Sequence, residues 1–213
     1  MQDDYTISEY RQALKSKILE ATMTAFTSQG IRAVKMDDIA NSLSISKRTL
    51  YELYSNKEDL LFECVKKYHA IRRDQMRRFA EDGSHNVMDI ILYAFRQKVE
   101  EIKSTTPQFY SDMEKYPKLL RFFEHEKAAT KQKFVDFLRR GTAEGYFCPN
   151  LNHELVASII DVQNQFVMGN KLYKQYSMQA VFFNLIHLSL RGLCTQRGIE
   201  VLDRFINDYH EQA

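Results

Sequence analysis

Residues 30–61 constrain the fold of this chain more than any other segment does. They read GIRAVKMDDIANSLSISKRTLYELYSNKEDLL, in which two short helical patterns meet at a tight connection. The apolar positions that such a helix pair must bury are Ile39, Leu43, Ile45, Leu50 and Leu53. Ala40 is small where the second helix crosses the first, so that the two backbones can approach closely. The spacing therefore predicts a helix-turn-helix over residues 36–54.

The second helix of this pair carries a polar face that suits a nucleic acid. Ser46 is a good N-cap for it, because a serine hydroxyl accepts a hydrogen bond from a backbone N–H at the helix start. We expect DNA to be read mainly by Ser46, Lys47, Arg48, Thr49, Tyr51 and Tyr54, with Lys35 and Lys57 on phosphates. An ordinary helical hairpin with a polar outer face is the alternative. Such a hairpin would not be expected to combine the small alanine, the capped second helix and this basic face.

The rest of the chain predicts an all-α protein. Its 213 residues include only 7 Gly and 3 Pro, and strand-like alternation is scarce. Outside the helix-turn-helix we expect helices over residues 8–28, 55–79, 86–104, 107–113, 116–141, 153–173, 177–196 and 199–209. Gly30 is placed to end the first of them in a left-handed conformation. Ser55 and Glu58 have the spacing of a capping box for the next.

Composition and charge narrow the class of protein. With 44% hydrophobic and 27% charged residues, the chain has an ordinary soluble composition. Residues 11–57 hold 8 Lys and Arg against 4 Asp and Glu. This surplus of positive charge is sufficient for a small DNA-binding domain. The most apolar run, residues 181–190, is too short to span a bilayer, so we expect no membrane segment. Three scattered cysteines and a polar, acidic N-terminus predict a cytoplasmic protein.

The sequence gives little support to an enzyme. The six histidines are scattered, and neither a glycine-rich phosphate loop nor a nucleophile elbow is present. His125 lies between two glutamates and could be a metal or catalytic group, but an exposed charged helix face explains it as well. We therefore expect no catalytic residue, no metal site and no cofactor, and a helical enzyme is the disfavoured alternative.

The two long helices near the C-terminus are unusually apolar. The second, over residues 177–196, is apolar almost all round, as a helix buried on every side is. Two such helices that meet their copies in a second chain would form a four-helix interface. For that homodimer interface we expect Ile159, Phe166, Phe182, Ile186 and Leu190. The alternative is that both helices simply complete the core of the monomer.

With these residues in hand, the chain resembles the TetR family, the tetracycline-repressor-like transcriptional regulators. The resemblance is specific over roughly residues 11–62 and much weaker beyond them. The positions that match the family signature are Met36, Ile39, Ala40, Ile45, Ser46, Thr49, Leu50, Tyr51, Tyr54, Lys57 and Leu60.

Four positions depart from the family pattern. Ser44 replaces the usual turn glycine, in a conformation that serine tolerates less readily. Arg48 replaces a second common glycine, and its guanidinium matches the major-groove edge of guanine. Lys35 stands where a helix-capping threonine is common. Leu53 takes the place of the second tyrosine, which puts Tyr54 at the following phenylalanine position, where a ring can be mostly packed.

The resemblance implies nine or ten helices in two domains. Residues 1–55 would be the helix-turn-helix DNA-binding domain, and residues 56–213 a helical effector-binding and dimerisation domain. It implies a repressor that binds double-stranded DNA at a palindromic operator as a homodimer and is released by a small-molecule effector. Aromatic or polar residues on otherwise apolar helices are the expected lining of the effector site: Tyr93, Arg96, Tyr110, Tyr116, Phe122, Phe137, Asn164 and Phe166. Control by a protein partner is the alternative to control by a small ligand.

Overall fold

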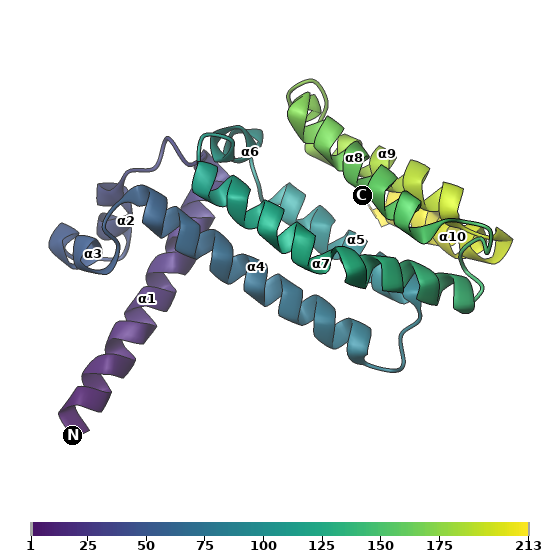
Figure 1. The fold of residues 1–213 in the computed structure, drawn as a ribbon. Coiled ribbons are helices and arrows are strands. Elements are labelled where there is room, and N and C mark those ends of the chain that lie inside the picture. The colour runs from purple at the N-terminus through teal and green to yellow at the C-terminus, as the bar shows by residue number, and fades with distance from the viewer. Residues whose placement is uncertain (1, 213) are drawn as a thin grey trace. The chain divides into compact units, whose positions relative to one another are not determined.

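The structure, a computed structural model, describes residues 2–212 and the side chains of residues 9–207. Its described residues form ten α-helices, which are labelled in Figure 1, and one short 3-10 helix; they confirm the all-α prediction. They are α1 (Gln2–Gln29), α2 (Met36–Ser42), α3 (Lys47–Leu53), α4 (Lys57–Glu81), α5 (Val87–Lys103), α6 (Pro107–Met113), α7 (Pro117–Ala143), α8 (His153–Gly169), η1 (Leu172–Lys174), α9 (Met178–Leu193) and α10 (Gln196–Gln212). Across the described residues, no helix is both long and apolar enough to cross a membrane.

The two apolar helices near the C-terminus end earlier than predicted. Helix α8 stops at Gly169, and Lys171 then adopts a left-handed conformation with φ 54° before the 3-10 turn. Helix α9 stops at Leu193, whose carbonyl accepts a hydrogen bond of 2.9 Å from the N–H of Cys148. This contact belongs to an isolated antiparallel bridge between Phe147 and Cys194. A backbone pairing so distant in sequence gives no signal in the local pattern.

The chain divides into two compact units. The first consists of Met1–Asp74 and Ser104–Phe123, and the second of Gln75–Lys103 and Glu124–Ala213. The first unit holds the helix-turn-helix with α1 and α6, and α4 and α7 each contribute to both units. The predicted domain boundary at residue 55 stays a prediction.

Helix α1 ends where the sequence predicts. Gly30 has φ 87°, and its N–H donates to the carbonyl of Phe26 at 2.9 Å, which closes the last turn. A Cβ at Gly30 would lie 2.6 Å from Cγ of Gln108 and 3.3 Å from a carboxylate oxygen of Asp112. Glycine is therefore required here both for its conformation and for the close approach of α6.

A buried carboxylate fastens α6 to the loop that precedes the helix-turn-helix. Asp112 is 0% exposed, and its carboxylate accepts hydrogen bonds of 2.8 Å from the N–H of Arg32 and from the side-chain amide of Gln108. The ammonium of Lys115 lies 3.6 Å away. Buried charge is retained only where it is paired and hydrogen-bonded, and these donors meet that condition.

The start of α4 corrects the predicted capping box. Asn56, rather than Ser55, caps the helix, because its side-chain oxygen accepts from the N–H of Asp59 at 2.9 Å. The amide of Asn56 in turn donates to the Asp59 carboxylate at 2.9 Å. Ser55 and Glu58 have the same spacing one residue earlier, so spacing alone did not distinguish the two candidates.

The second unit has its own apolar core between α5, α7, α9 and α10. Val87, Met88, Val135 and Phe147 lie there with 0–2% of their surface exposed. Phe147 packs directly against Gly141 of α7, where a Cβ would come within 2.1 Å of the ring. Helix α7 is thus held close to the loop before α8.

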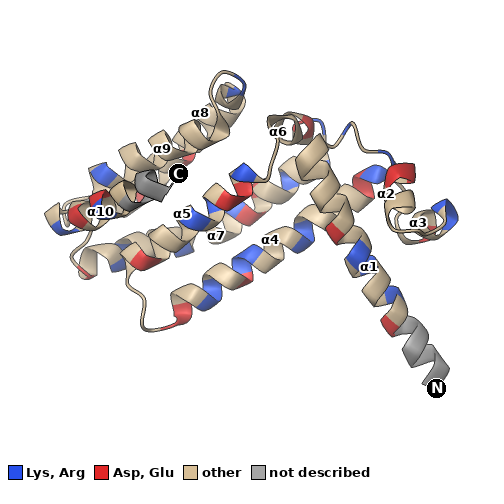
Figure 2. Ribbon diagram, turned by 180° about the vertical axis from the view of Figure 1, so that it is seen from behind, with Lys and Arg blue, Asp and Glu red and all other residues tan. Residues whose placement is uncertain are grey.

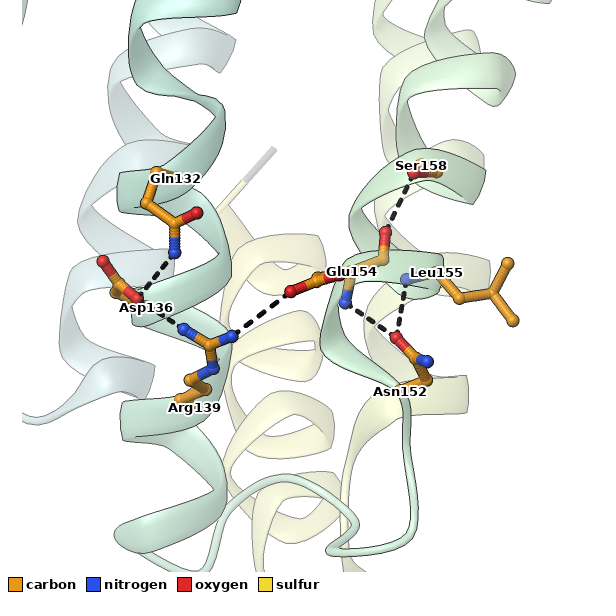
Figure 3. A network of polar contacts seen from close by, with 7 residues as sticks. All are labelled: Gln132, Asp136, Arg139, Asn152, Glu154, Leu155 and Ser158. Carbon is orange, nitrogen blue, oxygen red and sulfur yellow. Dashed lines mark hydrogen bonds and ion pairs between the residues drawn. The ribbon is translucent and has the colours of Figure 1, made fainter.

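Polar contacts fix the first turn of α8 (Figure 3). Arg139 of α7 bonds Asp136 on its own helix at 2.9 Å and Glu154 of α8 at 3.5 Å. The side chain of Asn152 caps α8 by accepting from the backbone N–H groups of Glu154 and Leu155, at 3.1 and 3.0 Å. These contacts link the start of α8 to α7.

We predict that Asp112→Ala lowers the free energy of unfolding by about 1–3 kcal/mol, because it removes the buried acceptor of two part-buried hydrogen bonds, from the N–H of Arg32 and the side-chain amide of Gln108. Urea denaturation followed by circular dichroism measures the change. Asp136→Ala removes an exposed aspartate and serves as the control, with an expected change within about 0.5 kcal/mol. Equal effects of the two substitutions would show that the buried carboxylate adds nothing to stability.

Candidate DNA-binding site

The turn between α2 and α3 brings the two helices close together. Ala40 is 2% exposed, and its carbonyl accepts a hydrogen bond of 3.0 Å from the N–H of Ile45. Ser44 has φ 53°, the left-handed conformation that glycine adopts with least strain. The departure from the family's turn glycine therefore places a strained serine in the left-handed conformation.

Helix α3 is capped at its start and anchored in the middle. The hydroxyl of Ser46 accepts from the N–H of Thr49 at 3.0 Å, which confirms the predicted N-cap. The two side-chain hydroxyls also share a hydrogen bond of 2.8 Å. Leu50 is 0% exposed and fixes the helix in the core of the first unit. The opposite face of α3 is consequently held outward.

That outward face holds two basic side chains of the predicted set, Lys47 and Arg48. Arg48 has 89% and Lys47 60% of its side chain exposed, and Tyr51 is 43% exposed. Both cations have carboxylate partners: Arg48 donates to Glu52 at 2.8 Å, and Lys47 donates to Asp37 at 2.9 Å. Figure 2 shows basic residues on α3 and acidic residues at the start of α2. The hydrogen bond and charge of each carboxylate raise the pKa of the cation it holds.

Tyr54 lies in the core of the first unit instead of on this face. Its side chain is 7% exposed, and burial raises the pKa of its phenol to about 12. Position 54 is where the family has phenylalanine, and the tyrosine here occupies the same interior place. We therefore remove Tyr54 from the set of DNA contacts.

Lys57 supports the loop before the helix-turn-helix. Its ammonium donates to the carbonyl of Val34 at 2.7 Å and to that of Arg32 at 3.4 Å. Burial lowers the pKa of this ammonium. Its two carbonyl partners already occupy part of its capacity to donate hydrogen bonds. Lys35 is exposed at the start of α2, where its backbone N–H donates to Asp38 at 2.8 Å. A phosphate contact of Lys35 stays a prediction.

An exposed apolar stripe runs along α8. Leu155, Ile159, Val162 and Phe166 are 49–62% exposed, and their spacing places them on one helix face. Leu188 of α9 is 71% exposed. Two of these five, Ile159 and Phe166, belong to the predicted dimer interface. Leu155, Val162 and Leu188 are not in the predicted set, although the spacing of Leu155 and Val162 relative to Ile159 was visible in the sequence.

The remaining predicted interface residues face the core of the second unit. Phe182 and Ile186 pack against a cluster formed by Phe95 and Phe205, and Phe182 lies 5.4 Å from Phe95 between ring centroids. Leu190 packs against the larger core cluster of this unit. These three residues therefore agree with the alternative that α9 helps to complete the core of the monomer.

The predicted effector residues are divided between the two units. Tyr110, Tyr116 and Phe122 belong to the first unit, and the other five to the second. Within the second unit, Tyr93 stacks on Phe79 at 4.1 Å, and Arg96 lies over the Phe205 ring at 5.3 Å. Asn164 and Phe166 are exposed on α8. Their type marked them as candidates, but which face of each helix they occupy depends on tertiary packing.

A small apolar cavity lies among α5, α9 and α10. Its volume is about 10 Å³, and none of the predicted effector residues lines it. The lining is Ile91, Leu92, Phe95, Phe183, Ile186, His187, Leu190, Leu202, Phe205 and Ile206. In the described part of the chain, Nδ1 of His187 is buried without a hydrogen-bond partner. A larger hollow of about 570 Å³ lies in the first unit, with a mixed lining that includes Lys15, Asp59 and Lys118.

Comparison with known proteins agrees with this architecture. The model of the family described as "Bacterial regulatory proteins, tetR family" matches residues 18–64. The transcriptional repressor KstR2 of Mycobacterium tuberculosis is 24% identical over 151 residues, which cover 68% of this chain and 75% of KstR2. The structure of that ketosteroid transcriptional regulator aligns with a TM-score of 0.55 and 20% identity, covering 85% of this chain and 95% of the other. A putative transcriptional regulator from Saccharomonospora viridis in complex with choline aligns with a TM-score of 0.66 and 14% identity, covering 87% and 100%.

The fold and the helix-turn-helix thus define a DNA-binding transcriptional regulator with a helical C-terminal part. Residues 18–64, which include the helix-turn-helix, match the TetR family of bacterial regulatory proteins. Proteins of this family are transcriptional regulators and not enzymes, which agrees with the sequence-based expectation.

We predict that Ser44→Gly raises the free energy of unfolding by about 1 kcal/mol, because glycine adopts the left-handed conformation without the steric cost of a Cβ. Ser42→Gly, at the end of α2, is the control and should lower stability by about 0.5–1 kcal/mol. Chemical denaturation of both variants measures the difference. A loss of stability in Ser44→Gly would show that the serine side chain contributes more than the strain costs.

Proposed function

We propose that this TetR-family regulator is a cytoplasmic repressor that binds a palindromic operator as a homodimer. The observation that carries the proposal is the outward face of α3. A capped helix fixed by buried Leu50 presents Arg48 and Lys47 to solvent. A helix of this kind inserts into the major groove, where its first turns contact base edges. The repressor role is supported by the name of the relative KstR2.

The proposed contacts divide into base readers and phosphate contacts. Arg48 is the candidate for direct readout, since a guanidinium can donate two parallel hydrogen bonds to guanine. The other members of the set at this helix are its N-cap Ser46 and, within α3, Lys47, Thr49 and Tyr51. Lys35 is proposed as a phosphate contact. Lys57 acts mainly by holding the loop before α2 through its two carbonyl partners, which leaves less of its charge for DNA.

The proposed homodimer uses the exposed stripe of α8 together with Leu188 of α9. Contiguous apolar side chains of this size on a helix face favour burial against a partner. A two-fold symmetric pair of subunits also explains why a regulator with one reading helix per chain would need a palindromic site.

We further propose that a small-molecule effector controls DNA binding. The apolar cavity around His187 is its candidate site, and at about 10 Å³ the cavity must open before it can admit an organic molecule. An effector would then release DNA only if it binds the opened state more tightly than the DNA-bound state. The ketosteroid regulator KstR2 and the choline complex suggest chemically unlike ligands, so they do not define this one.

The alternative is control by a protein partner. A gel shift with DNA that flanks the gene of this protein, with and without candidate molecules, separates the two. Release of DNA by a small molecule supports the effector, and release only by a protein fraction supports the partner. Substitution of His187 by Phe should abolish release by a molecule that uses this cavity, while DNA binding itself persists.

We predict that Arg48→Ala weakens operator binding by about 1–3 kcal/mol, roughly 5- to 150-fold, and does so mainly at one base-pair position. Fluorescence anisotropy with operator duplexes that carry single base-pair changes measures this effect. Arg121→Ala removes an exposed arginine of α7 in the same unit and should leave affinity nearly unchanged. A loss in Arg48→Ala that is equal for every sequence would show that the guanidinium only contacts the backbone.

We predict that Val162→Glu converts the dimer into monomers, because a charge in the centre of the stripe would be buried without a partner at the interface. Sedimentation velocity measures the oligomeric state. Leu120→Glu, which adds the same charge at an exposed leucine of α7, should leave the dimer intact. An intact Val162→Glu dimer would place the interface elsewhere.

A further inference from the structure

Both basic side chains on the outward face of α3 are ion-paired within the protein. The guanidinium of Arg48 lies 2.8 Å from the carboxylate of Glu52, one helical turn further along α3. The ammonium of Lys47 lies 2.8 Å from the carboxylate of Asp37 in the first turn of α2. Both carboxylates are more than half exposed, so they lie at the same surface as the cations. The face proposed to meet DNA thus carries two positive and two negative groups.

The energetic consequence depends on the kind of DNA. Binding to DNA of arbitrary sequence comes almost entirely from cations that neutralise phosphates and release counterions. A cation that already has a carboxylate beside it contributes little to that release, and the carboxylate itself repels the phosphates. Exposed ion pairs are individually weak, however, so an operator that offers hydrogen bonds to base edges can still draw the cations away from them.

We propose that Asp37 and Glu52 are specificity-determining residues that suppress the binding of this regulator to DNA of arbitrary sequence. They act by neutralising Lys47 and Arg48 until base contacts at the operator replace the ion pairs. The inference rests on the proposed role of Lys47 and Arg48 as DNA contacts. It assigns to the two carboxylates a function that is separate from holding the fold.

A purely structural role makes the opposite prediction. The pair of Lys47 and Asp37 connects the starts of α3 and α2, and the pair of Arg48 and Glu52 joins consecutive turns of α3. If these pairs served only to hold α3 in place, their removal would weaken binding to every DNA. If they suppress unspecific binding, their removal strengthens it.

The test uses the full-length protein with Asp37→Asn or Glu52→Gln and a 30-base-pair duplex of random sequence. Fluorescence anisotropy across a series of salt concentrations should show about 3- to 10-fold tighter binding by each variant at low salt. The plot of log affinity against log salt should become steeper by about one unit, as expected for one additional phosphate contact. The ratio of operator affinity to random-duplex affinity should fall.

Glu63→Gln is the matched control, because it removes the same charge from an exposed position on α4 in the same unit. Its effect on random-duplex affinity should be smaller than that of Glu52→Gln. Thermal unfolding of each variant confirms that the fold is retained. Equal effects of the control and the two variants, or weaker binding by the variants, would overturn the inference.

A double-variant cycle separates this inference from the proposed function. Glu52→Gln should have no effect on random-duplex affinity when Arg48 is already Ala. If Arg48→Ala alone leaves operator binding unchanged, the proposed contact is wrong, and the inference for Glu52 falls with it. If Arg48→Ala weakens operator binding but Glu52→Gln has no effect, only the inference is overturned.

Discussion

The orientation of the DNA-binding helices depends on the buried carboxylate of Asp112. A charge with no exposed surface is stable only with donors around it, and Arg32 and Gln108 supply them at 2.8 Å. Because the donor of Arg32 is a backbone N–H, the interaction fixes the path of the loop and not merely a side chain. Lys57 binds carbonyls of the same loop from α4. Helix α2 begins directly after this loop, so its start is set by α4 and α6 together.

Helix α3, the proposed recognition helix, has a fixed backbone, whereas the ion pairs on its outward face can exchange partners. Its cap at Ser46 and its anchor at Leu50 use buried or local contacts that DNA does not need to break. Its two basic side chains are instead held by exposed ion pairs, which exchange partners at small cost. The contacts that stabilise the helix-turn-helix are therefore different from the side chains that are proposed to bind DNA.

Local sequence predicted the helix-turn-helix because its determinants are local. The spacing of Ile39 and Leu50, the cap at Ser46 and the terminating Gly30 all act within a few residues of the structure they specify. The same reasoning failed where two neighbouring positions were chemically equivalent, as for Ser55 and Asn56 at the start of α4.

Tertiary contacts decided the positions that the sequence left open. Tyr54 was predicted to contact DNA and Phe182 to lie in a dimer interface, yet both side chains pack inward. On α9, apolar residues surround the helix, so the pattern could not show which of them face the core and which, like Leu188, face outward. The effector residues were chosen by type alone, and the apolar cavity has a different lining.

The central claim, sequence-specific binding of a symmetric dimer, is tested most directly by hydroxyl-radical footprinting on the DNA that flanks the gene of this protein. The account predicts two protected segments related by two-fold symmetry, with centres about 10–10.5 base pairs, or a small multiple of this, apart. The protected segments should contain an inverted repeat. Binding that protects no defined segment, or protects all sequences equally, would contradict the account.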